Sequence, residues 1–374
     1  IQKIKMLDGN SMFPINTKES LELGDAIRIH SAKDKKRESV KIDFIVSEEN
    51  GYLIPAKDGF DVGDAVYLIM KKREIRKYPH IIPNSLSKYK RHPGISLAPV
   101  TKTHNLSKNS RKIFKDGIYI KTANFNDFYV IQSVKPEKII FTLDKSNFVQ
   151  LKNNINSIPF KKSEIIIYLK PFFPEDDEIF LEEALEFLVK NGFTDFIVNN
   201  LGHISLLRNR NLNLIVGDYL YVFNNYAGEF FIDNGADFIV VPYESNKKNI
   251  ISLAENLKPE RLFATVFAYP ELFRIKADLT KLYNFEKFAD SKENEFYLKR
   301  KDDETFVIPD KPFSIIDKIS QLEKIGIKKI IADLSYISLT KNYYKTIMKT
   351  IENREIIEKF TRFNFKEGFY REND

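Results

Sequence analysis

From Gly117 onward, the sequence alternates short apolar runs with amphipathic stretches. The runs are nearly continuous and rich in Ile and Val, which is typical of strands buried on both faces of a parallel sheet. Between them lie segments such as 178–190, whose apolar spacing predicts a helix. The predicted strands span 118–122, 138–143, 164–169, 195–199, 212–216, 237–241, 261–267 and 328–333. Eight strands with intervening helices over about 250 residues predict an α/β fold, a (β/α)8 TIM-like barrel, with a doubly wound open sheet as the alternative.

The stretch 199–244 indicates where a functional site would lie. It reads as strand end, helix, strand, helix and strand, and each strand is followed by polar residues. Because the carboxyl ends of parallel strands meet at one edge, we expect the groups that leave consecutive strands to converge there. The side chains expected at this substrate-binding rim are Lys121, Asp144, Lys170, Asn199, Asn200, Tyr221, Asn224, Tyr269 and Asp333.

Three residues of the rim are candidates for catalysis. Asp218 follows the fifth strand and Glu244 the sixth, and neighbouring strands lie only about 5 Å apart. If the two carboxylates approach one another, one pKa rises and the pair can act as acid and base. The alternative is that Asp218 caps a turn and Glu244 pairs with Lys247, Lys248 or a lysine of the barrel. His203, one turn into the helix after the fourth strand, is a proton shuttle, a ligand for a substrate phosphate, or a histidine satisfied on the helix face.

Composition excludes several kinds of chemistry. The chain has no cysteine, which excludes disulfides, thiolate catalysis and Cys-ligated zinc or iron–sulfur clusters within it. No HExxH motif, phosphate-binding glycine loop or Ser-His-Asp set stands out, so the sequence predicts no metal site and no cofactor. No run of about 18 apolar residues occurs, and we therefore expect a cytoplasmic protein without a membrane partner.

The first 72 residues have a different pattern. Short apolar runs alternate there with Gly, Asn and Asp turns, which predicts strands. The segment 21–29 (LELGDAIRI) recurs as 60–68 (FDVGDAVYL), a turn that leads into a strand. We interpret residues 1–72 as a small all-β barrel domain, with a structural or docking role.

A basic segment separates this domain from the barrel. Residues 71–116 contain 13 Lys or Arg and two acidic residues, so this segment has a net charge of +11. The whole chain has a net charge of +7, so the remaining residues together carry −4. Residues 73–116, with four prolines, read as a linker, and 117–374 as the barrel. Basic residues interleaved with tyrosines suit contact with phosphates and bases, so tRNA or rRNA is a candidate partner; the alternative is a solvated linker. The expected nucleic-acid contacts are Lys71, Lys72, Arg73, Arg76 and Lys77.

An insertion of about residues 270–312 separates the last two predicted strands. Residues 295–299 and 305–308 flank Lys301-Asp302-Asp303-Glu304, which predicts a β-hairpin. Asp302 and Asp303 resemble a metal-binding pair, but the chemistry of a turn accounts for them. Tyr219 and Tyr221 follow the fifth strand directly, where they are candidates for stacking on a base or ring.

The barrel segment resembles a known family, the collagenase-like peptidases of the U-thirty-two family. The resemblance covers about residues 115–370, and the preceding β module resembles the small barrel between the halves of long family members. The chain therefore resembles the carboxyl-terminal half of such a protein. The motifs that carry the resemblance are LGHISLL (201–207), GDYLYVFNN (217–225), NGADFIVV (234–241) followed by Glu244, FYLKRKDDETFVI (296–308), FSIIDKISQLEKIGIKKIIADL (313–334) and Gly368-Phe369-Tyr370.

The resemblance implies more than one activity. Family members are labelled peptidases, and others resemble proteins that hydroxylate transfer RNA, ribosomal RNA or a quinone precursor with an iron–sulfur cluster held by cysteines. Here the corresponding segment, 267–296, has no cysteine, and the family's glutamate is absent around Ala264 and Thr265. The first hypothesis is therefore RNA binding or support of RNA hydroxylation at the rim. The alternatives are a peptidase that uses Glu244 and Asp218, and an inactive scaffold that docks to an upstream catalytic half of the same protein.

Overall fold

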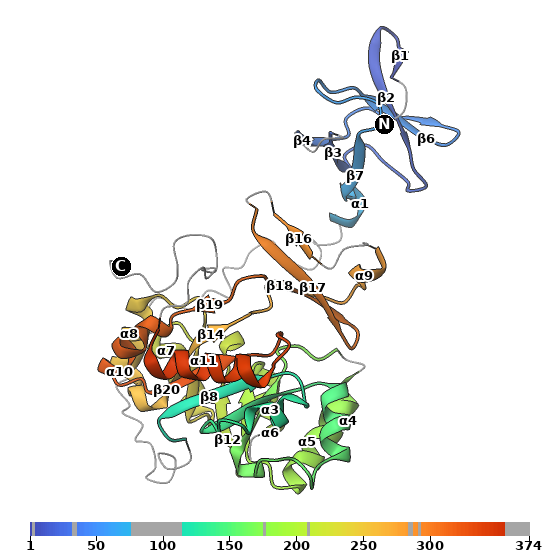
Figure 1. Cartoon of the computed structure of the whole chain (residues 1–374). Helices are drawn as coiled ribbons and strands as arrows, with labels where there is room; N and C mark the ends of the chain where they lie inside the picture. Colours follow the sequence, from blue (N-terminus) through green and yellow to red (C-terminus); the bar gives the residue numbers. More distant parts are fainter. Residues whose placement is uncertain are drawn as a thin grey trace, which may run out of the picture. The chain divides into compact units, whose positions relative to one another are not determined.

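The computed structural model describes residues 1, 4–31, 36–75, 114–174, 177–207, 210–282, 287–290 and 293–355. The chain divides into two compact units, Ile1–Ala98 and Pro99–Asp374, which are drawn in Figure 1 and described separately below. Most of the predicted basic linker, from 76 to 113, and the aromatic tail from 356 to 374 lie outside the described residues.

The amino-terminal unit is all-β, as predicted, and its strands form two antiparallel sheets around one core. The first sheet contains, in spatial order, β1 (Lys5–Leu7), β2 (Asn10–Asn16), β6 (Gly51–Pro55) and β5 (Val46–Glu48). The second contains β4 (Arg37–Lys41), β3 (Ala26–His30) and β7 (Ala65–Met70), which is followed by the single-turn helix α1 (Lys72–Ile75). Phe13 and Ile54 from the first sheet pack with Ile27 and Ile29 from the second.

The sequence repeat in this unit encodes the same turn twice. Gly24 and Gly63 both have positive φ, 95° and 91°, which glycine adopts without a steric cost. The aspartate after each glycine is buried and accepts a hydrogen bond from the backbone N–H three residues before it, Asp25 from Glu22 at 2.9 Å and Asp64 from Asp61 at 2.8 Å. The Gly-Asp pair therefore fixes the entry of the chain into β3 and β7.

The second unit contains a closed barrel of eight parallel strands. Around the barrel these are β8 (Gly117–Thr122), β9 (Lys138–Leu143), β10 (Ile165–Leu169), β11 (Asp195–Val198), β12 (Asn213–Val216), β13 (Phe238–Val241), β14 (Leu262–Ala268) and β20 (Lys329–Asp333). Pairing of β13 with β14 and of β20 with β8 closes the ring. The predicted TIM-like barrel is confirmed, with each predicted strand within one residue at both ends, and the alternative of an open sheet is wrong.

Alternating residues of the barrel strands face two separate cores. Ile139, Ile165 and Ile167 point outward into the layer between strands and helices, whereas Ile140 and Ile166 point into the barrel. All of them are fully buried, which explains why the strands read as continuous apolar runs. Phe114, just before β8, packs edge-on against Phe238 and Phe263 within the inner core. The barrel interior is therefore filled, and open space is confined to its ends.

Helices follow most of the barrel strands. They are α3 (Asp127–Ile131), α4 (Lys145–Asn153), α5 (Glu178–Lys190), α6 (Leu201–Leu207), α7 (Asn225–Asp233), α8 (Lys247–Leu257), α10 (Ile319–Lys324) and α11 (Lys341–Asn353). Their buried faces, such as Leu181, Leu185 and Leu188 of α5, contribute to the outer core. Within the described ranges, no helix has the length and apolar character needed to span a bilayer.

The segment between β14 and β20 forms a small antiparallel sheet. In spatial order it contains β15 (Phe273–Ile275), β18 (Glu304–Pro309), β17 (Glu295–Lys301) and β16 (Lys287–Ala289), with the short helix α9 (Leu279–Leu282) between β15 and β16. The chain then returns to the barrel through β19 (Phe313–Ser314), which pairs antiparallel to β14. Asp302 and Asp303 form the turn of the β17–β18 hairpin, and Asp302 has a positive φ of 49°.

Candidate functional site

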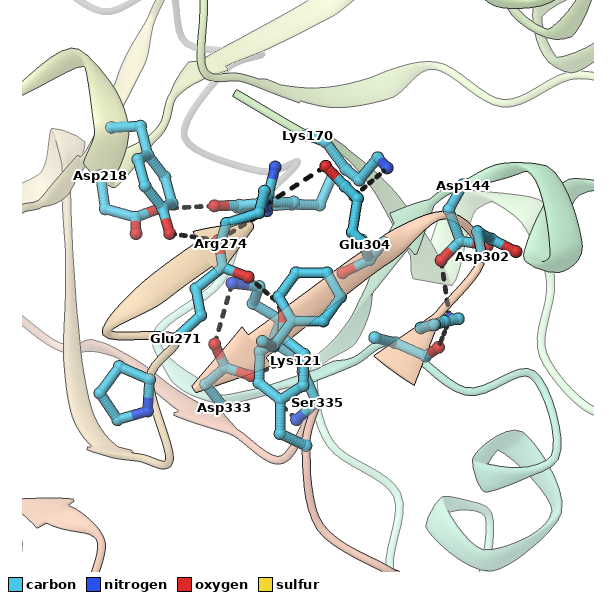
Figure 2. A pocket seen from close by; sticks show the side chains of 18 of the residues that line it. Lys121, Asp144, Lys170, Asp218, Glu271, Arg274, Asp302, Glu304, Asp333 and Ser335 are labelled. Carbon is cyan, nitrogen blue, oxygen red and sulfur yellow. Dashed lines mark hydrogen bonds and ion pairs between the residues drawn. The ribbon is translucent and has the colours of Figure 1, made fainter. Parts of the chain in front are cut away.

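A small cavity lies at the carboxyl-terminal mouth of the barrel, where the ends of several barrel strands and the β17–β18 hairpin contribute side chains (Figure 2). Its volume is about 30 Å³, enough for one or two water molecules. Of the rim residues predicted from the sequence, it brings together Lys121, Asp144, Lys170, Asp218 and Asp333. Further residues that line the cavity are Ala123, Tyr168, Tyr219, Tyr243, Glu271, Arg274, Lys301, Asp302, Glu304, Phe306 and Tyr336.

Lys121 is the cation at the centre of this mouth. It is the penultimate residue of β8 and forms an ion pair of 2.8 Å with the buried Asp333 at the end of β20. Its ammonium nitrogen also lies 3.9 Å from the centre of the Tyr168 ring. Burial opposes the charged form, but the charges of Asp333 and Asp218 outweigh it and raise the pKa of Lys121. Lys121 is therefore held charged between two carboxyl groups.

Asp218 is a buried carboxyl group of the mouth that shares Lys121 with Asp333. It begins the 3-10 turn after β12, is 7% exposed, and accepts a hydrogen bond of 3.1 Å from the hydroxyl of Tyr168. Burial raises the pKa of Asp218, and the charge of Asp333 raises it further, while Lys121 opposes the shift. A carboxyl group with this environment holds a proton more tightly than an exposed aspartate does.

Glu271 organises one wall of the cavity. The Tyr219 hydroxyl donates to it at 2.5 Å, the Tyr336 hydroxyl also donates to it, and Arg274 forms an ion pair with it at 2.5 Å. On the facing side, the Tyr243 hydroxyl donates to Asp333 at 3.1 Å. The carboxyl groups of Asp218, Glu271 and Asp333 thus each accept a hydrogen bond from at least one tyrosine hydroxyl, which fixes their orientation.

The β17–β18 hairpin covers this cavity with charged side chains. Lys301 forms an ion pair of 2.6 Å with Asp144 and donates to the backbone oxygen of Ala123. Glu304 forms an ion pair of 2.8 Å with Lys170. On the far side of these contacts lies an outer pocket of about 350 Å³, which is also lined by Asp144, Lys170, Asp302 and Glu304. The two ion pairs therefore separate a large outer pocket from the small inner cavity.

Other predicted rim residues have structural contacts and do not line the cavity. Asn199 donates to the Leu169 carbonyl at 2.8 Å, Asn200 accepts from the N–H of Gly202 at 2.8 Å, and Asn224 caps α7 by accepting from Ala227 at 3.0 Å. The Tyr269 hydroxyl lies 3.3 Å from that of Tyr343. These contacts anchor the loops that leave the strands.

His203 is buried in the helix layer. Its Nδ1 accepts from the N–H of Asn199 at 3.4 Å, and its ring meets Phe173 edge-on. Burial lowers the pKa of His203 to about 4, so the ring is neutral over most of the pH range. It is not among the residues that line the mouth cavity.

Glu244 lies at the outer edge of the same region. Its side chain is exposed, but partial desolvation raises its pKa and the charge of Asp218 adds to that shift. Tyr221 is 49% exposed and stacks on Phe223 with ring centres 5.9 Å apart. The charges of Glu244 and Asp218 also add to the raised pKa of Tyr221, after its desolvation, which places the three groups within electrostatic reach of one another.

The predicted nucleic-acid contacts belong to the amino-terminal unit. Lys71 forms an ion pair of 2.6 Å with Glu19, Lys72 donates to the backbone oxygen of Leu23, and Arg73 is exposed. Arg76 and Lys77 lie outside the described residues. Binding of tRNA or rRNA through this segment stays a prediction.

Several residues that line the mouth were not predicted from the sequence. Glu271, Arg274 and Glu304 come from the insertion, and only folding of that segment back over the barrel brings them to the mouth. Tyr168, like Ile166, faces the barrel interior from β10, and the apolar pattern IIIYL does not show which of its residues do so. In the described part of the chain, no group of three or more His, Asp or Glu residues could hold a metal ion.

Comparisons with known proteins give weak likenesses. No family model matches the chain, and no curated protein matches it. A solved structure titled "Native KDPGal structure" has 9% identity and a TM-score of 0.38 over 63% of this chain and 92% of that one. A fructose-1,6-bisphosphate aldolase from Coccidioides immitis has 10% identity and a TM-score of 0.34 over 66% and 89%. The U32 peptidase Mk0906 has 12% identity and a TM-score of 0.30 over 41% and 69%, and membership of the U-thirty-two family stays a prediction.

Proposed function

We propose that the chain is a hydrolase that works by acid–base catalysis at the barrel mouth, with Asp218 as the group that carries the proton. One observation carries the proposal: Asp218 is a buried carboxyl group at the end of a barrel strand, its pKa is raised, and it lines a cavity. Carboxyl groups with perturbed pKa values in a cavity are candidates for proton transfer. The carboxyl-terminal mouth is also where enzymes with this fold place their active sites.

The neighbours of Asp218 have complementary roles in this proposal. Protonated Asp218 donates its proton to the leaving atom of the substrate, and the ammonium of Lys121 stabilises the carboxylate that remains. The Tyr168 hydroxyl holds the carboxyl group in one orientation. Glu244, which is more exposed, accepts a proton from the attacking water. The two carboxyl groups thus divide the acid and the base role between a buried and an exposed position.

A peptide is the first substrate to test. The motifs at 201–207, 217–225 and 234–241 resemble those of the U-thirty-two peptidases, and this resemblance supports the choice. Because the inner cavity holds only one or two waters, substrate access requires the β17–β18 hairpin to move away from the rim.

The experiment compares cleavage of gelatin and of a peptide library by the unmodified chain and by Asp218→Asn. Loss of the proton donor is expected to lower the rate by about 10²-fold or more. Glu164→Gln, which changes a half-buried carboxylate just before β10 at the opposite end of the barrel, is the matched control and should cleave at the original rate. A substrate that is cleaved equally fast by Asp218→Asn would remove Asp218 from the mechanism.

A second candidate function is a non-catalytic scaffold. The mouth is filled by ion pairs between the barrel and its own insertion, which favours this alternative. If the chain is a scaffold, we expect no turnover of any substrate. The Asp218→Asn variant should then be at least as stable as the parent and should bind the same partners. Turnover that depends on Asp218 would exclude it.

A further inference from the structure

Arg274, which lines the mouth cavity, has buried N–H groups that lack a hydrogen-bond acceptor among the described residues. Its Nη2 is paired with Glu271, but its Nε and Nη1 are buried and have no hydrogen-bond partner among the described residues. The guanidinium lies against the ring of Phe306, with Cζ 5.4 Å from the ring centre, and so presents these N–H groups within the cavity wall. Buried donors without acceptors destabilise a protein, and native structures have few of them. Such groups indicate a missing acceptor.

Glu304 lies close to one of these donors, but it does not satisfy it. Its Oε1 lies 4.0 Å from Arg274 Nε, which is beyond hydrogen-bond distance, while its Oε2 is bound by Lys170 at 2.8 Å. Glu304 is 9% exposed and lies at the boundary between the inner cavity and the outer pocket, because both are lined by Glu304 and Lys170. The Glu304 carboxylate is thus paired with Lys170 and lies near Arg274 without forming a hydrogen bond to it.

The hairpin can withdraw Glu304 by a local movement. The neighbouring strand β15 pairs with β18 from Thr305 onward, so Glu304 lies beyond the last paired residue of β15. The turn beside it contains Asp302, with its positive φ, and Asp303, whose side chain is 97% exposed. Displacement of this tip would leave Lys170 and Arg274 as two cations without their shared carboxylate, next to an outer pocket of about 350 Å³.

We propose that Lys170 and Arg274 form a binding site for an oxyanion, the carboxylate or phosphate group of a ligand, and that Glu304 occupies this site in the closed structure. An oxyanion that replaces Glu304 can approach closely enough to accept from Arg274 as well as from Lys170. The body of the ligand then lies in the outer pocket, against Phe173 and Phe180. This inference rests on the proposed function, since it names the charge of the substrate group that enters the mouth.

The test is a calorimetric titration of the full chain with inorganic phosphate and, separately, with malonate. Glu304→Gln removes the competing carboxylate and is expected to bind the better of the two anions about tenfold more tightly than the unmodified chain, the equivalent of one charged hydrogen bond. Addition of Lys170→Met to this variant should abolish the gain. The anion that binds more tightly identifies the ligand class.

The matched control is Glu295→Gln, which removes a carboxylate from an ion pair of 2.6 Å with Lys287 in the same sheet. It should bind both anions as the unmodified chain does. Equal affinity of Glu304→Gln and Glu295→Gln would overturn the proposal, as would a gain that survives Lys170→Met. Because the titration needs no turnover, such a result would leave the proposed role of Asp218 untouched.

A second measurement keeps the proposal testable if Glu304→Gln does not fold. The chain has no cysteine, so a dye on Asp303→Cys reports on the hairpin tip alone. Saturating phosphate or malonate should change the dye emission in the otherwise unmodified chain and should not do so when Lys170→Met is added. An emission that neither anion changes would contradict displacement of the tip.

Discussion

The two ends of the barrel have the same kinds of charged side chains but use them differently. At the amino-terminal end, Asp195 accepts from Lys138 at 2.5 Å, from Asn213 at 2.6 Å and from Thr194 at 3.1 Å, all on or beside barrel strands. At the mouth, Lys121 is shared by Asp333 and Asp218, and two further ion pairs, Lys170–Glu304 and Lys301–Asp144, join the barrel to the insertion. Charges at the amino-terminal end therefore tie neighbouring strands together, whereas those at the mouth leave a carboxyl group with a raised pKa and hold the β17–β18 hairpin over the cavity.

The largest expected difference concerns stability. Asp195→Asn leaves Lys138, whose side chain is 12% exposed, buried without a counterion, and should lower the free energy of unfolding by roughly 3 kcal/mol or more. Asp218→Asn replaces a carboxyl group that burial already disfavours as an anion and keeps an acceptor for Tyr168, so it should cost less than about 1 kcal/mol. Denaturant unfolding of both variants measures the difference. Equal losses would remove the distinction between the two ends.

Acid sensitivity should come from the mouth side, through His203 on the helix after β11. Its folded-state pKa of about 4 is below the ordinary value of 6.5, so the folded state binds fewer protons and stability is lost as the pH falls between these values. The full shift corresponds to roughly 3 kcal/mol. Unfolding of the parent and of His203→Gln across this range should show that the variant lacks the loss. Parallel curves would mean that the ring is not held neutral.

Asp127, on α3 after β8, should give a somewhat smaller effect of opposite sign. It accepts a hydrogen bond of 2.5 Å from Thr122, but burial raises its pKa from 3.8 to about 6. The folded state therefore binds more protons in this window, and stability is lost as the pH rises through it. The loss relative to Asp127→Asn should be roughly 2 to 3 kcal/mol. If the difference in unfolding free energy between the two proteins stays constant from pH 3.8 to 6, the pKa of Asp127 is not raised in the folded protein.

The barrel strands were predictable because both faces of each strand are buried, so the sequence signal is a plain apolar run. The same cause hides which strand residue faces the barrel interior, and Tyr168 was missed for that reason. Asp218, Lys121 and Asp333 were predictable because they directly follow or end strands. Glu271, Arg274 and Glu304 were not, because their positions depend on how the long segment between β14 and β20, residues 269–328, folds back over the mouth. Asn224, in the loop between β12 and α7, was assigned to the site from the sequence, but its side chain caps α7.

The central claim is that burial at the mouth raises the pKa of Asp218, so that its carboxyl group holds a proton above the ordinary range for an aspartate. Carbon NMR of the chain labelled at its aspartate carboxyl groups, with the Asp218 signal assigned by its absence in Asp218→Asn, measures this directly. We predict that the signal titrates with a pKa above 3.8, the value for an unperturbed aspartate. A signal that titrates at or below that value would contradict the claim and leave the mouth without a proton donor.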